Sequence, residues 1–176
     1  MSDIFGKVLT DQNFIKKILG KIPGFSGYFE QQNRRASDKI LREFIATHFE
    51  EQWKRISSIQ RDIISQGGIE FIDDIEQASI KLRQFIDRVK TAAYGYSPFF
   101  DAIKVNEDEL TAVYQYDATL LAKEEDISRA IDNLEASIGA DGFPAAIRNL
   151  VSVTQQTLDA FNKRGEVMKG VSGESQ

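Results

Sequence analysis

Residues 106–138 carry a heptad repeat that constrains the fold more than any other part of the chain. The stripe positions of this repeat follow one another at alternating steps of three and four, with no glycine or proline between them. These positions are Leu110, Val113, Asp117, Leu120, Glu124, Ile127, Ile131, Leu134 and Ile138. Such spacing predicts one long helix that packs an apolar stripe against neighbouring helices. Two carboxylates, those of Asp117 and Glu124, lie on this stripe.

Glycines and prolines divide the rest of the chain into further segments of helical periodicity. We expect a short helix over about 11–20 and long helices near 28–66, 69–94, 106–138 and 144–168. Glycine just past a helix end favours a left-handed cap, and Pro144 suits the first turn of a helix. No segment alternates at period two for long enough to predict a strand.

Each of the other long segments has its own apolar stripe. The stripe positions are Leu41, Ile45, Phe49, Trp53, Ile56, Ile59 and Ile63 in 28–66; Phe71, Ile72, Ile75, Ala78, Ser79, Leu82, Phe85, Ile86, Val89, Ala92 and Ala93 in 69–94; and Ile147, Leu150, Thr154, Leu158, Phe161 and Met168 in 144–168. Short links at 67–68 and 139–143 force the helices that they join to be antiparallel. We therefore expect an all-α fold, an antiparallel up-down four-helix bundle over 28–170. A short amphipathic helix within residues 1–22 and a linker at 23–27 precede it, and a disordered tail at 171–176 follows.

The composition favours a folded, cytoplasmic protein and disfavours several classes of function. The chain has 176 residues, 41% of them hydrophobic, a net charge of −5 and no cysteine. An acidic chain of this kind is not expected to bind nucleic acid, because affinity for phosphate comes from clustered Lys and Arg. The lack of cysteine excludes disulfides and thiol nucleophiles. No apolar run reaches the roughly 20 residues that a membrane span needs.

The expected connection at 94–105 is too aromatic for a loop that faces only water. Antiparallel packing places it at the same end of the bundle as the start of the 28–66 helix. The aromatic residues gathered there are Phe25, Tyr28, Phe29, Tyr94, Tyr96, Phe99 and Phe100. One interpretation is a hydrophobic plug that closes the core. The other is a docking surface for a partner, since Tyr and Phe suit an apolar contact with a polar rim.

The pattern of residues 1–22 predicts a basic amphipathic segment, which contains four lysines and two aspartates. The residues expected to make contacts are Phe5, Lys7, Phe14, Lys16, Lys17 and Lys21. Such a segment can lie in an anionic membrane surface, bind a groove in a protein partner, or fold back onto its own bundle.

The two carboxylates on the 106–138 stripe need partners if they are buried. Counting heights along antiparallel helices places Asp117 level with Arg83 and Arg164, with His48 about one turn away. The same count places Glu124 near Arg61 and Thr157. One interpretation is that these polar residues specify the register of the helices. The other is a polar pocket that orients a small ligand between helices.

A metal or cofactor is not expected. A di-metal carboxylate site in a bundle uses two Glu-x-x-His pairs, and the single histidine, His48, follows Ile45 at that spacing. We interpret His48 as a hydrogen-bonded, partly buried residue beside the core.

These features together favour a non-catalytic interaction or scaffold protein. It would contact a protein partner, or a membrane surface peripherally, through its N-terminal segment and its aromatic end, and an unused apolar stripe would allow it to form homo-oligomers. The alternative is a bundle that binds a small ligand in a polar pocket lined by Asp117, Arg83 and Arg164. We expect no enzymatic activity, because no nucleophile and base are paired in a known pattern.

Overall fold

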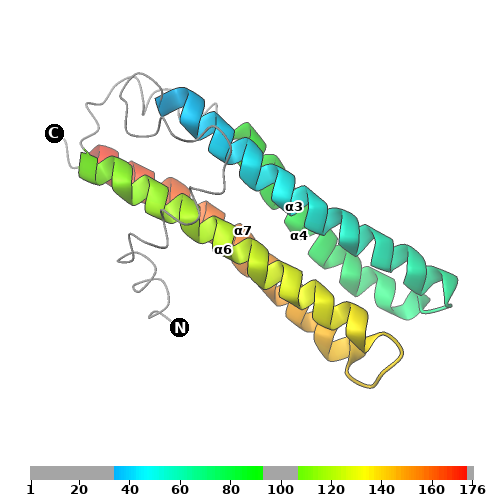
Figure 1. Ribbon diagram of the computed structural model, residues 1–176. Helices are drawn as coiled ribbons and strands as arrows, with labels where there is room; N and C mark the ends of the chain where they lie inside the picture. Colours follow the sequence, from blue (N-terminus) through cyan, green and yellow to red (C-terminus); the bar gives the residue numbers. More distant parts are fainter. Residues whose placement is uncertain (1–33, 93–106, 174–176) are drawn as a thin grey trace.

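The computed structural model describes residues 34–92 and 107–173, and its side chains at residues 41–92 and 119–163. It contains the helices α3 (Arg34–Ser65), α4 (Ile72–Thr91), α6 (Glu107–Ser137) and α7 (Phe143–Gly173), and the 3-10 turn η3 (Ile69–Phe71). No strand occurs among these residues, so the described part of the chain is all-α, as predicted (Figure 1). The predicted helix over 11–20 lies outside the described residues.

Glycine ends two of the helices in the predicted way. Gly67 and Gly139 adopt φ values of 85° and 78°, in the left-handed region that glycine reaches without steric cost. After α3, the amide of Gly68 donates to the carbonyl of Ile63 at 3.0 Å, and the amide of Gly67 donates to that of Ile64 at 3.1 Å. This pair of hydrogen bonds is a Schellman cap, and it turns the chain sharply toward η3 and α4.

The predicted start of the first long helix near 28 lies outside the described residues, whereas the C-terminal end of the last helix differs from the prediction. The described part of α3 begins at Arg34, and α7 begins at Phe143 with Pro144 in its first turn. α7 then continues through Gly165 and Gly170 to Gly173, past the predicted end at 168. Three residues of the predicted tail at 171–176 are therefore helical, and the other three lie outside the described residues. A glycine inside a helix costs only about 1 kcal/mol, which helix packing readily offsets.

The four helices form two antiparallel hairpins, α3–α4 and α6–α7, that lie side by side (Figure 1). Between the hairpins the neighbours are parallel. α4 runs with α7, because Phe71 contacts Phe143 and Phe85 contacts Phe161. α3 runs with α6, because Gln52 bonds to Glu124 and Arg55 to Ser128 and Asp132. The long connection after α4 does not require α4 and α6 to be neighbours, and they share no large contact.

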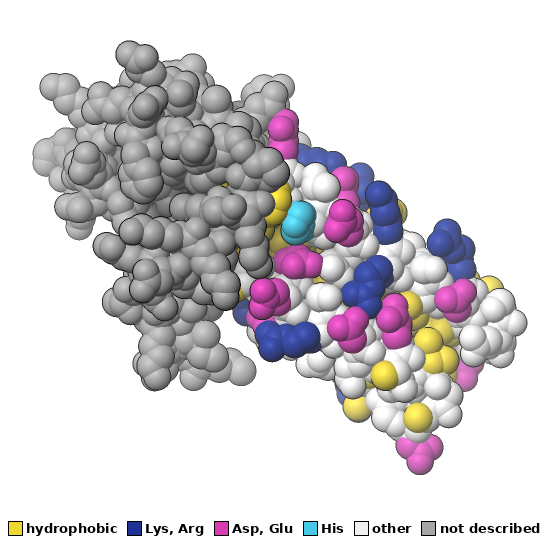
Figure 2. All heavy atoms as spheres, in the orientation of Figure 1, with side chains coloured by type: hydrophobic (Ala, Val, Ile, Leu, Met, Phe, Trp, Pro, Cys, Tyr) yellow, Lys and Arg dark blue, Asp and Glu magenta, His cyan; other side chains and the backbone are white. Residues whose placement is uncertain are grey.

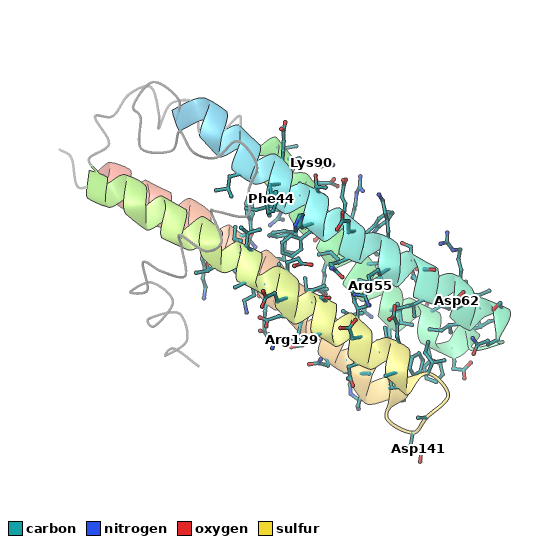
Figure 3. All side chains as sticks on the ribbon, in the orientation of Figure 1. Phe44, Arg55, Asp62, Lys90, Arg129 and Asp141 are labelled. Carbon is teal, nitrogen blue, oxygen red and sulfur yellow. The ribbon has the colours of Figure 1, made fainter. Side chains whose placement is uncertain are left out.

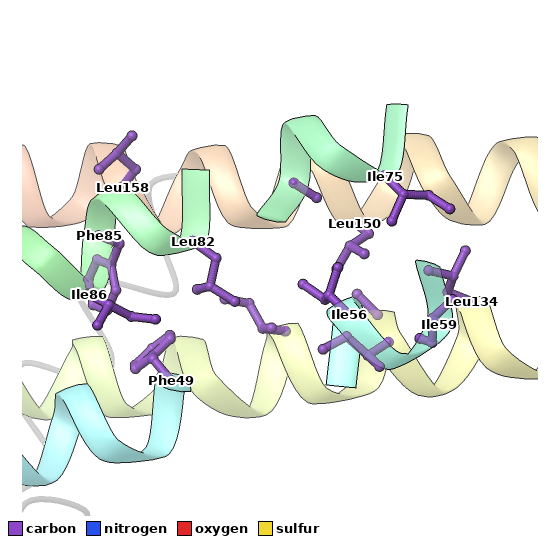
Figure 4. Close-up of a cluster of buried hydrophobic side chains, with 14 of the residues drawn as sticks. Phe49, Ile56, Ile59, Ile75, Leu82, Phe85, Ile86, Leu134, Leu150 and Leu158 are labelled. Carbon is purple, nitrogen blue, oxygen red and sulfur yellow. The ribbon is translucent and has the colours of Figure 1, made fainter. Parts of the chain in front are cut away.

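The hydrophobic core draws on all four helices. Phe49, Ile56 and Ile59 of α3 meet Ile75, Leu82, Phe85 and Ile86 of α4, Leu134 of α6, and Leu150 and Leu158 of α7 (Figure 4). In α4 the predicted stripe is buried from Ile75 to Val89 and half-buried at Ile72 and Ala92, and in α6 it is buried at Leu120, Ile127, Ile131 and Leu134. Trp53 is the exception in α3, because it lies half-buried at the edge between α3 and α4 while its neighbour Gln52 is buried.

None of the helices in the described ranges is long and apolar enough to cross a lipid bilayer.

Candidate functional site

The contact between α3 and α6 is built from polar side chains, which we call the α3–α6 polar seam. It consists of Gln52 and Arg55 on α3 and of Glu124, Ser128, Asp132 and Glu135 on α6. Gln52 Nε2 donates to Glu124 Oε1 at 2.5 Å, and Arg55 Nη1 donates to Gln52 Oε1 at 3.2 Å. The two ends of the Gln52 amide are therefore both used, which a buried amide requires.

Arg55 extends the seam along α6. Its Nη1 donates to Ser128 Oγ at 3.2 Å, and its Nη2 donates to Asp132 Oδ1 at 2.6 Å and to Glu135 Oε2 at 3.1 Å. In Figure 3 the labelled Arg55 reaches from α3 toward α6. Desolvation of the guanidinium alone would lower the pKa of Arg55, but the hydrogen bonds and charges of Asp132 and Glu135 outweigh it and raise this pKa further. Arg55 is therefore held as a cation across the helix contact.

Helical spacing explains why these residues meet. Gln52 and Arg55 lie three positions apart, and Ser128, Asp132 and Glu135 follow Glu124 at steps of four, four and three. Residues at these spacings share one face of a helix. Because α3 and α6 are parallel, the two faces keep the same register over several turns. The seam can fix this register, as polar residues do between the helices of coiled coils.

His48 lies one turn before Gln52 on the same face of α3. Its ring is half-buried and packs against Phe44, with 4.1 Å between the ring centroids. Figure 2 shows the histidine, in cyan, beside hydrophobic side chains on the face formed by α3 and α6. Its Nδ1 atom is buried and has no hydrogen-bond partner among the residues that the structure describes. The predicted partial burial is therefore confirmed, but the hydrogen bond expected for His48 is missing at Nδ1.

A second polar cluster joins α3 to α4 on another side of the molecule. Lys90 donates a hydrogen bond to Glu50 Oε1, and Arg83 Nη1 lies 4.0 Å from the same oxygen. The guanidinium carbon of Arg83 also lies 5.3 Å from the ring centroid of Trp53, within the range of a cation–π contact. On α4 itself, Arg83 Nε lies 3.3 Å from Asp87 Oδ1. Arg83 is thus engaged with α3 and with its own helix, rather than lining a pocket against α6 as the sequence count implied.

Lowering the pH is expected to remove the stabilising contribution of Glu50. The hydrogen bond from Lys90 is the largest cause that lowers the pKa of Glu50 below its ordinary value of 4.5, and the charges of Lys90, Arg83 and Lys54 add to it against partial burial. Since the folded pKa is below the unfolded one, the contribution is complete above about pH 4.5 and disappears as the pH falls through the folded value. Glu50→Gln should lower the free energy of unfolding by up to about 1 kcal/mol at pH 7. The difference should vanish at low pH.

Urea denaturation at pH 7 and at pH 3 measures this difference. The exposed residue Glu76 of α4 provides the matched variant Glu76→Gln. An effect of Glu50→Gln that stays constant across this pH range would contradict the assignment.

The structure gives partners for one of the two carboxylates predicted on the α6 stripe, Glu124. Glu124 is bonded to Gln52, whereas Arg61, its predicted partner, is exposed farther along α3. The Gln52 and Arg55 contacts show the register of α3 against α6, which a height count from the loops does not resolve to within two turns. Asp117 and Arg164 lie on α6 and α7, but their side chains are outside the described residues.

The residues predicted to contact partners lie outside the part of the chain that the structure describes. They are the aromatic residues Phe25, Tyr28, Phe29, Tyr94, Tyr96, Phe99 and Phe100 and the N-terminal residues Phe5, Lys7, Phe14, Lys16, Lys17 and Lys21. Their attachment points are described, however. The first described residue of α3, the end of α4, and the start of α6 lie at the same end of the molecule, opposite the two hairpin turns (Figure 1).

Sequence reasoning missed Gln52, Arg55, Ser128 and Asp132. A usable signal was present, because Gln52 and Arg55 continue the face begun by His48 at steps of four and three. A second polar face starts at Glu124 in the other helix. What the sequence did not contain was the pairing of α3 with α6, without which the two faces cannot be matched.

The polar side chains described above form networks between helices. The side chains of the α3–α6 polar seam bond to one another across the two helices. Within the described ranges, no group of three or more His, Asp or Glu residues is arranged to hold a metal ion. Comparisons of the chain with protein-family models, with curated proteins and with solved structures found no match.

Proposed function

We propose that the chain is a four-helix bundle in which the hairpins α3–α4 and α6–α7 close on one core, preceded by a short amphipathic helix within residues 1–22. The shared core supports this arrangement, because buried side chains from all four helices form one continuous cluster. Successive helices alternate in direction, and α4 and α6 are not neighbours, so that the parallel pairs α3–α6 and α4–α7 lie side by side.

The function that these features favour is a non-catalytic interaction or scaffold protein that makes contacts through one end of the rod. One observation carries this proposal: α3 begins, α4 ends and α6 begins at the same end. Arg42 Nη1 donates to the carbonyl of Lys90 at 3.5 Å and ties the early part of α3 to the last turns of α4. The basic segment 1–22 and the aromatic residues at 25–29 and 94–100 are all joined to the rod there.

An elongated body with its predicted contact residues joined at one end suits a protein that presents these residues to a surface. Several charged side chains of the described body already contact other helices. They are those of Arg55, Arg83 and Glu124. We propose that the surface contacted is an anionic membrane, with the protein cytoplasmic and peripheral. A protein partner is the competing outcome in the test below.

Deleting residues 1–22 is expected to abolish binding to anionic liposomes while the helical content of the body is unchanged. Each lysine near an anionic surface contributes about 1 kcal/mol, so replacing Lys7, Lys16, Lys17 and Lys21 together with glutamine should weaken binding at least about a hundredfold. Liposome sedimentation and circular dichroism measure the two effects.

The matched control removes four positive charges from exposed positions of the described body. It is Lys54→Gln/Arg61→Gln/Arg148→Gln/Lys163→Gln, and it should leave liposome binding nearly unchanged. The contact is with a protein if the full chain does not bind anionic liposomes and a protein that co-purifies with it is lost when residues 1–22 are deleted. If neither binding nor co-purification changes, the proposal is wrong.

A further inference from the structure

The four helix contacts of the structure are unequal in size and in chemistry. The contacts α3–α4, α4–α7 and α6–α7 are similar in extent, whereas α3–α6 is much smaller. α3–α6 is also the contact that the polar seam occupies. Figure 1 shows α3 and α6 facing each other across the two hairpins, with α4 and α7 behind them.

The opposite contact, α4–α7, contains two aromatic pairs, one at the hairpin-turn end beside η3 and one farther along the helices. Phe71 packs edge-on against Phe143 with 5.0 Å between ring centroids, and Phe85 packs against Phe161 at 5.7 Å. Ala78 of α4 is fully buried. Two hydrogen bonds lie at the rim of this contact, from Lys81 Nζ to Gln155 Oε1 at 2.5 Å and from Arg88 Nη1 to Asn162 Oδ1. Separating α4 from α7 would expose apolar surface to water, which is unfavourable.

Separating α3 from α6 exposes polar groups that water can satisfy, in addition to the apolar residues behind them. Gln52, Glu124 and Arg55 exchange their mutual hydrogen bonds for bonds to water, and the net cost of such an exchange is small compared with the strength of the bonds themselves. Nδ1 of His48, which is buried without a partner in the described residues, gains one. Polar composition and small extent therefore both lower the cost of opening this contact.

We infer that the two hairpins separate along the α3–α6 polar seam by rotating about the α4–α7 contact, which stays packed. We call the α4–α7 contact the spine. The seam then acts as a latch. Opening it uncovers the apolar residues directly behind it, among them Ile59 of α3 and Ile131 of α6. This inference concerns the body of the protein and does not depend on the proposed role of residues 1–22.

The absence of cysteine from the chain allows the opening to be measured by thiol labelling. Ile131→Cys places a single thiol behind the latch, and Ala78→Cys places one on α4, in the spine. Both positions are fully buried. For each full-length variant, the labelling rate in native buffer is compared with the rate that its own unfolding free energy permits. The Ile131→Cys thiol should react at least about tenfold faster than global unfolding allows, and the Ala78→Cys thiol should react at the global rate.

Latch variants in the Ile131→Cys background test the role of the polar residues. Gln52→Leu leaves Glu124 and Arg55 without the amide that joins them, and it should speed labelling about tenfold. Gln52→Leu/Glu124→Leu replaces the pair with apolar groups, and it should slow labelling below the rate of the unmodified seam. Lys81→Met/Gln155→Leu, on the rim of the spine, should leave the labelling of Ile131→Cys unchanged.

Two results would overturn the inference. The first is labelling of both thiols at their global unfolding rates with the same dependence on urea, which would describe a body that opens only by unfolding. The second is an identical effect of the single and double seam variants, which would mean that the polar pair does not control the opening.

Discussion

Phe85→Ala is expected to lower the free energy of unfolding by about 3–5 kcal/mol, the range measured when a buried aromatic ring is removed. Phe85 is fully buried on α4, and its ring lies 4.5 Å from that of Phe49 and 5.7 Å from that of Phe161. It therefore contacts both hairpins. The surrounding rings cannot collapse into the space that it leaves without shifting α3 or α7, so most of the cavity should remain.

Urea denaturation followed by circular dichroism measures this loss. The exposed neighbour Gln84 gives the control Gln84→Ala, which should change stability by less than about 0.5 kcal/mol. Phe85→Leu, which keeps most of the apolar volume, should lie between the two. A loss for Phe85→Ala as small as that of Gln84→Ala would mean that α4 and α7 do not share a packed core at this level.

Ile127→Asp should abolish cooperative folding at pH 7. Ile127 is fully buried on the heptad stripe of α6. A carboxylate in its place would lie among the apolar side chains of the described core, and burying an unpaired charge costs several kcal/mol. Domains of this size are stable by only about 5–15 kcal/mol. The expected result is loss of the thermal transition, with partial recovery at low pH, where the introduced carboxyl is neutral.

Ala136→Asp makes the same chemical change on the exposed face of the same helix. It should cost only about 1 kcal/mol, since it lowers helix propensity and places an exposed negative charge near Asp132 in the last turn of α6. If Ile127→Asp melts cooperatively near the temperature of the unmodified protein, the heptad stripe of α6 is not the buried face.

The apolar stripes were predictable because they depend on local spacing. A helix buries residues that repeat at three and four positions whatever it packs against, so Ile75, Leu82, Ile127 and Leu134 could be placed in a core from the sequence alone. The left-handed turns at Gly67 and Gly139 were predictable for a related reason, because only a few residue types adopt that conformation without strain.

The partners of the polar residues were not predictable in the same way. Arg83 was expected opposite α6 and lies against Trp53 and Glu50, and Glu124 was expected near Arg61 and bonds to Gln52. Both differences have one origin. Four helices can pack around a core with several orders of neighbours, and short links constrain only the helices that they join directly.

Amino-acid order alone determined the helices, their buried faces and the antiparallel direction within each hairpin, since these follow from backbone geometry and from the removal of apolar side chains from water. The tertiary structure decided that α3 lies beside α6 and α4 beside α7, and therefore which charges meet. Polar contacts between helices depend on a register of a few ångströms, and that register is a property of the whole packed core, which no single segment of the chain encodes.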